Sequence, residues 1–114
     1  MPAVFLSLVY HAAAMAFLWA PKSQSLRIVS LSAASCHVVV MALIAWRMRL
    51  VTVCTGAACW YTLCGMTVVS FAADAVLIAF AARNEQEKPL QIAATVLQIL
   101  GLLVTLLFAW NGTH

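Results

Sequence analysis

The sequence contains one stretch that restricts the fold more than any other, a long apolar run interrupted by a single carboxylate. Residues 50–82 lie between Arg49 and Arg83, and Asp74 is the only charged residue among them. At about 1.5 Å per residue, a helix over this whole run would be about 50 Å long, well beyond the ~30 Å hydrocarbon core of a bilayer. We therefore expect the helix that crosses the membrane to cover only 57–82. A carboxylate inside such a helix costs several kcal/mol unless it is protonated, paired or turned to a polar interior, so Asp74 predicts a bundle with polar groups inside.

Composition indicates the class of protein. Of the 114 residues, 66% are hydrophobic and only 8% are Asp, Glu, Lys or Arg, against about 25% charged residues in soluble domains. So few polar side chains cannot cover a globule in water, and the sequence predicts an integral membrane protein. The six Lys and Arg residues are scattered over short loops, without the basic cluster that nucleic acid or an anionic lipid patch requires. Nucleic acid is therefore excluded as a partner.

Hydrophobic segments separated by short polar loops predict four transmembrane helices. They cover approximately 3–20, 26–46, 57–82 and 90–110. No basic residue precedes the first segment, so we expect a retained span and not a cleaved signal peptide. With connections this short, successive helices must run antiparallel. The predicted fold is an all-α integral membrane protein, a single membrane domain over 1–114 that forms an up-and-down bundle of four transmembrane helices with no soluble domain.

The basic residues predict a membrane orientation. Four lie at one face of the predicted bundle and two at the other: Lys22, Arg27, Arg83 and Lys88 against Arg47 and Arg49. Cytoplasmic loops carry an excess of Lys and Arg. We therefore expect the loops of Lys22 and Arg83 on the cytoplasmic or matrix side, with both termini opposite.

The four cysteines follow neither a metal-binding nor a disulfide pattern. Cys54, Cys59 and Cys64 recur every five residues, which on a helix turns successive side chains by about 140°. We expect these three and Cys36 to act as small apolar residues.

Each predicted helix carries one strongly polar side chain near its middle. Counted from the end with Lys22 and Arg83, these side chains lie about nine or ten residues into the span, a depth of about 14–16 Å. The four residues are His11, His37, Asp74 and Gln98. Small and polar residues accompany them at spacings of three and four, the pattern by which helices pack in lipid. We therefore predict a buried polar layer at one depth.

Three interpretations of this layer are open. In the first, the four side chains hydrogen-bond between helices and fix their register, each bond contributing about 0.6–2 kcal/mol. In the second, Asp74 and a histidine belong to a path for protons or cations. In the third, His11 and His37 are axial ligands of one haem b, although helices ~8–10 Å apart leave little room for a porphyrin. A transition-metal site that adds Cys36 is disfavoured, because Cys36 and His37 are adjacent and point about 100° apart on a helix.

The sequence has no phosphate-binding loop, nucleophile elbow, HExxH motif or dinucleotide-binding glycine pattern, and its loops are too short for a catalytic domain. We therefore expect a non-catalytic accessory subunit of a larger membrane complex. Such a complex would be a respiratory-chain or other energy-converting assembly of the mitochondrial inner membrane or of a bacterial membrane. The expected partners are other membrane subunits and structural lipids. The alternatives are a small oligomeric transporter or channel that uses Asp74, and a haem- or quinone-associated membrane anchor that uses His11 and His37.

Overall fold

The computed structural model of the protein describes residues 2–21, 23–50, 57–83 and 87–113, and these residues form four α-helices. The helices are α1 (Pro2–Trp19), α2 (Gln24–Leu50), α3 (Ala57–Ala82) and α4 (Lys88–Thr113). Three of them contain segments long and apolar enough to cross a membrane: Gln24–Arg47, Ala57–Ala82 and Lys88–Trp110. The remaining helix, α1, is also apolar but is shorter. Both α2 and α4 continue into polar residues beyond their predicted spans, because a helix does not have to end where its apolar segment ends.

Side chains complete the hydrogen bonding at two helix ends. The Ser23 hydroxyl accepts a hydrogen bond from the Leu26 main-chain N–H at 3.1 Å, which caps the start of α2. The last carbonyls of α1 have no partner within their own helix. One of them, that of Leu18, accepts a hydrogen bond from the Gln91 side-chain amide at 2.6 Å. This bond ties the end of α1 to the start of α4.

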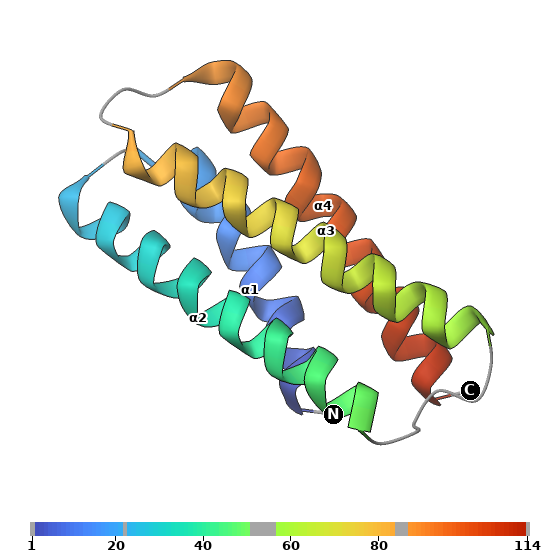
Figure 1. Cartoon of the computed structure of the whole chain (residues 1–114). Coiled ribbons are helices and arrows are strands. Elements are labelled where there is room, and N and C mark those ends of the chain that lie inside the picture. The colour runs from blue at the N-terminus through green and yellow to red at the C-terminus, as the bar shows by residue number, and fades with distance from the viewer. Residues whose placement is uncertain (1, 22, 51–56, 84–86, 114) are drawn as a thin grey trace.

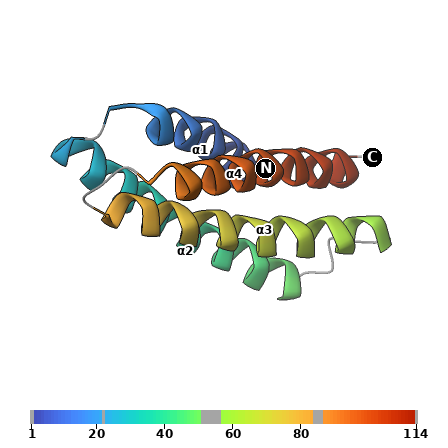
Figure 2. The same cartoon turned by 90° about the horizontal axis from the view of Figure 1, so that it is seen from above.

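Successive helices run antiparallel and pack side by side, which makes an up-and-down bundle (Figure 1). Each helix contacts its neighbours in sequence, and α1 also packs on α4, so the four helices close into a ring. Viewed from above, α1 and α4 form one layer over α2 and α3 (Figure 2). Among these four contacts around the ring, that between α3 and α4 is the most extensive and that between α1 and α2 is the smallest.

Buried residues recur along the helices at alternating spacings of three and four, the pattern of left-handed helix packing. In α1 they are Val4, Ser7, His11, Ala14 and Leu18, and in α4 they are Gln91, Ala94, Gln98, Gly101, Thr105 and Phe108. Many of these buried residues are small or polar. The inner face of the bundle is therefore built from the residues by which helices pack closely in lipid.

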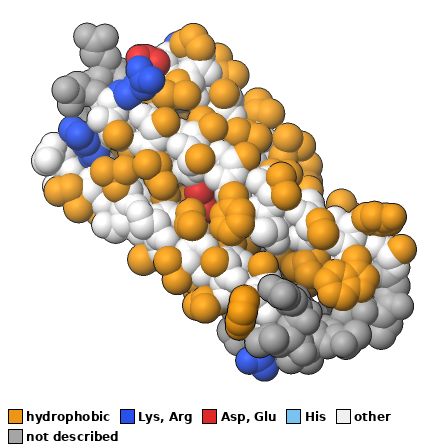
Figure 3. Space-filling model, in the orientation of Figure 1, with side chains coloured by type: hydrophobic (Ala, Val, Ile, Leu, Met, Phe, Trp, Pro, Cys, Tyr) orange, Lys and Arg blue, Asp and Glu red, His pale blue; other side chains and the backbone are white. Residues whose placement is uncertain are grey.

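The outer face is apolar on every helix. Large exposed side chains include Phe5 on α1, Leu43 on α2, Val68 on α3 and Leu107 on α4. Hydrophobic side chains are spread along the full length of the face seen in Figure 3, where the visible Lys and Arg side chains lie at its ends. This surface is compatible with a membrane.

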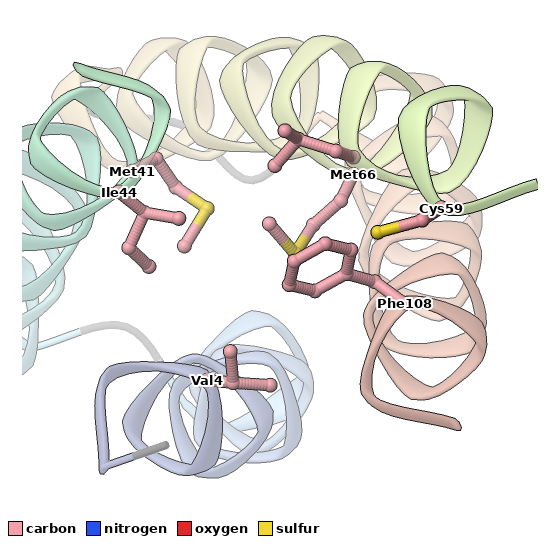
Figure 4. Close-up of a cluster of buried hydrophobic side chains, with 7 residues drawn as sticks. Val4, Met41, Ile44, Cys59, Met66 and Phe108 are labelled. Atoms are coloured by element: carbon pink, nitrogen blue, oxygen red, sulfur yellow. The ribbon is translucent and has the colours of Figure 1, made fainter. Parts of the chain in front are cut away.

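Two clusters of buried apolar side chains fill the bundle at different positions along its axis. One draws on all four helices and comprises Val4, Met41, Ile44, Cys59, Leu63, Met66 and Phe108 (Figure 4). The other comprises Ala14, Leu18, Ala34, Leu77, Phe80 and Ala94. The residues of the predicted polar layer lie between the two clusters, as His11 does between Val4 and Ala14 on α1, whereas buried Ser30 and Gln91 lie beyond Ala34 and Ala94 of the second cluster. Apolar side chains thus enclose the polar region at both ends.

The cysteines differ from the expectation in one respect. Cys36 and Cys64 are free and exposed, but Cys59 is buried and disulfide-bonded. The prediction that the cysteines act only as small apolar residues is therefore wrong for Cys59. It rested on helical spacing, which applies only within a helix, and α3 begins at Ala57. Cys54 lies outside the described residues.

Candidate functional site

A chain of hydrogen bonds connects α1, α2 and α3 in the middle of the bundle. His37 Nδ1 lies 2.7 Å from Asp74 Oδ2, and His37 Nε2 lies 2.8 Å from the Ser7 hydroxyl oxygen. All three side chains are buried. Because a net charge shielded from water is costly, we expect one proton to lie between the carboxylate and Nδ1. The Nε2–H of His37 then donates to Ser7.

His11 connects α1 to α3 and α4. Its Nδ1–H donates to Gln98 Oε1 at 2.7 Å, and the Ser70 hydroxyl donates to its Nε2 at 3.4 Å. The amide nitrogen of Gln98 donates in turn to the main-chain carbonyl of Ala73 at 3.4 Å. His11, Gln98 and Ser70 are fully buried. Both nitrogens of this histidine therefore have partners inside the bundle.

Three rings pack together beside these bonds. Tyr10 stacks on His37 with ring centroids 3.9 Å apart and an interplanar angle of 13°. The rings of His11 and His37 meet edge to face, with centroids 4.9 Å apart. Two buried oxygens in this region, the Tyr10 hydroxyl and Asp74 Oδ1, have no hydrogen-bond partner among the described residues. The site thus has unused hydrogen-bonding capacity on α1 and α3.

A glycine makes room for one of these rings. A Cβ atom at Gly101 would lie 2.7 Å from His11 Cε1 and 3.1 Å from Nε2. Real Cβ atoms essentially never approach another heavy atom so closely. The position of His11 in the site therefore requires glycine at this turn of α4.

The ring geometry does not suit a haem held by both histidines. The two rings are in edge-to-face contact, whereas a porphyrin would have to lie between them. All four of their nitrogens lie within hydrogen-bond distance of other side chains, so none is available to iron. Among the described residues, no group of three or more His, Cys, Asp and Glu side chains could hold a metal ion.

The order of bonds from Ser7 through His37 to Asp74 is the order found in serine hydrolases. Those enzymes also need hydrogen-bond donors for the oxyanion, usually main-chain N–H groups. Ser7 lies inside α1, where the main-chain N–H groups are used by the helix itself. Its side chain is also fully buried. In this arrangement Ser7 is a buried hydrogen-bond partner of His37.

The structure brings together all four residues predicted for the polar layer. It joins them as two pairs, His11 with Gln98 and His37 with Asp74. Sequence reasoning did not identify Tyr10 as part of the site. The available signal was its position three residues after Ser7, which places both on one face of a helix.

No protein-family model, curated protein or solved structure matches this chain.

Proposed function

We propose that the protein is an integral membrane protein with four spans, and that it serves as a non-catalytic subunit of a larger membrane assembly. The observation that supports this function best is the bonding of both histidines of the polar layer within the bundle. Both nitrogens of His11 and both nitrogens of His37 are bonded to side chains of other helices. Such a layer holds helices in place, whereas a haem ligand would need a free nitrogen.

The apolar clusters on both sides of the layer support the same function. Apolar side chains flank the polar layer on both sides along the bundle axis, where a transport path would need a polar route. An assembly subunit needs no such route, because its partners contact its outer surface. That surface is apolar on all four helices, so partners would meet it within the bilayer.

We also propose an orientation in the membrane. The basic residues Lys22, Arg27, Arg83 and Lys88 favour the cytoplasmic or matrix side for the loops that contain them. The disulfide of Cys59 is near the start of α3, at the other end of the bundle, and disulfides persist in oxidising compartments. Both signals support this proposal, in which the start of α3 faces the periplasm or intermembrane space.

Native electrophoresis of the full chain tests the assembly proposal. After digitonin extraction from its own membrane, we expect the chain in a particle far larger than the purified recombinant chain in the same detergent. Depletion of the chain should reduce the amount of that particle. Identical migration of the native and recombinant chains would refute the proposal.

A small transporter that uses Asp74 is the second candidate. It is favoured by the two buried oxygens without partners, Asp74 Oδ1 and the Tyr10 hydroxyl, which could bind a transported proton or cation. The test is proton or cation flux into liposomes that contain the wild-type chain or Asp74→Asn. Flux that the substitution abolishes would establish transport. Liposomes with the wild-type chain that are no more permeable than protein-free liposomes would exclude it.

A further inference from the structure

A cavity of about 150 Å³ lies between α1 and α2, beside the hydrogen-bonded chain of Ser7, His37 and Asp74. Apolar side chains form its walls and polar groups form its inner end: Leu6, Ala33 and Val40 against Ser7, Tyr10 and His37. Cys36 also lines it. Since Leu6 and Cys36 are exposed, the cavity borders the outer surface of the bundle. A molecule dissolved in the bilayer could therefore enter it from the side.

The size of the cavity fits one ring. An engineered apolar cavity of about 150 Å³ in another protein binds benzene. The ring of Tyr10, which stacks on His37, offers an aromatic face along one wall. The cavity thus suits a single six-membered ring and is too small for a porphyrin or a sterol nucleus.

The inner end of the cavity can bond to an oxygen on that ring. A hydroxyl group has one donor and two acceptor positions. If His37 Nε2–H donates to Ser7, the hydroxyl hydrogen of Ser7 and one of its lone pairs are still available. Ser7 can therefore donate to a carbonyl oxygen or accept from a ring hydroxyl, and these are the groups of a quinone and of its quinol.

We infer that the cavity between α1 and α2 binds the ring of a lipid-soluble quinone or quinol, with an oxygen bonded to Ser7 and the tail leaving past Leu6 into the bilayer. The ring would lie beside His37, whose Nδ1 is bonded to Asp74. The Nε2–H of the same imidazole orients the Ser7 hydroxyl. This site does not depend on the proposed assembly, because all its residues belong to this chain.

Equilibrium binding of 2-decyl-1,4-benzoquinone, whose ring carries no substituent besides the tail, to the full chain in phosphatidylcholine nanodiscs tests the inference. We expect saturable binding that decylbenzene, which has the same tail and no ring oxygen, does not displace. Ala33→Phe should fill the cavity and weaken binding more than tenfold. Its matched control is Ala45→Phe, also on α2 and partly buried, which lines a different pocket and should leave binding unchanged.

Ser7→Ala should weaken binding about fivefold through loss of one hydrogen bond, with helix content checked by circular dichroism. Non-saturable uptake by the wild-type chain would overturn the inference. Equal loss of binding in Ala33→Phe and Ala45→Phe would also overturn it, because binding would not then depend on this cavity. Displacement by decylbenzene, or full affinity in Ser7→Ala, would refute the bond to the ring oxygen.

Discussion

Substitution of Gly101 by alanine should displace His11 and destabilise the bundle. The added methyl group would lie 2.7 Å from His11 Cε1, 3.1 Å from Nε2 and 3.2 Å from Nδ1. The ring cannot simply tilt away, because its Nδ1 is bonded to Gln98 at 2.7 Å and its edge contacts the ring of His37. We therefore expect the substitution to break the bond to Gln98.

The size of the effect follows from three contributions. Overpacking of a filled interior costs about 1–3 kcal/mol. Loss of one internal hydrogen bond costs about 0.5–1.5 kcal/mol more. Replacement of glycine by alanine in a helix returns about 1 kcal/mol. The net expectation for Gly101→Ala is a loss of about 2 kcal/mol in the free energy of unfolding.

The assay is unfolding of the purified chain in mixed micelles of increasing sodium dodecyl sulfate content, followed by circular dichroism. Gly65→Ala is the matched control on α3, because its added methyl would meet only Val104 Cγ1, at 3.3 Å, which has to move by only a few tenths of an ångström. We expect this control to be as stable as the wild type or up to about 1 kcal/mol more stable. Equal stability of the two variants would refute the argument that His11 requires glycine opposite it.

Three further predictions concern other contacts. Asp74→Leu should cost about 3 kcal/mol in the free energy of unfolding, because it leaves the buried donor of His37 unpaired. Asp74→Asn keeps an acceptor for this donor and should cost less in the same assay. Trp19→Phe removes an exposed hydrogen bond of 2.9 Å to α4 and should cost about 0.5–1 kcal/mol, again by detergent unfolding. In detergent, a thiol-reactive maleimide should modify Cys36 and Cys64 without pretreatment and Cys59 only after reduction and unfolding, as peptide mass spectrometry would show; modification of Cys59 in the untreated chain would contradict the disulfide.

The helices and the polar layer could be predicted because both depend on helical geometry alone. A fixed rise per residue converts sequence position into depth, and a spacing of three or four places side chains on one face. The pairing could not be predicted in this way. Depth puts His11, His37, Asp74 and Gln98 at one level, but it does not say which neighbour each imidazole faces around the ring of helices.

Two features of the site depended on information outside helical periodicity. Tyr10 was missed because the depth argument took one strongly polar side chain from each helix, whereas the ring of Tyr10 stacks on a buried imidazole. The disulfide of Cys59 was missed because the spacing argument treated the cysteines as helical throughout. In both cases the role of the residue depends on its contacts in the folded chain. The residue type alone does not reveal that role.

The pattern of bonds in the layer explains how one register of the four helices is selected. Ser7 bonds to α2, His11 to α3 and α4, and His37 to α3. Gln98 on α4 also bonds to the main chain of α3, so every helix is joined to at least two others. If one helix slid by a turn, about 5.4 Å, its polar side chain would face an apolar cluster and lose its partner. Each unpaired polar group would then cost several kcal/mol in a medium without water. The layer therefore penalises every wrong register more strongly than its own modest bonds stabilise the correct one.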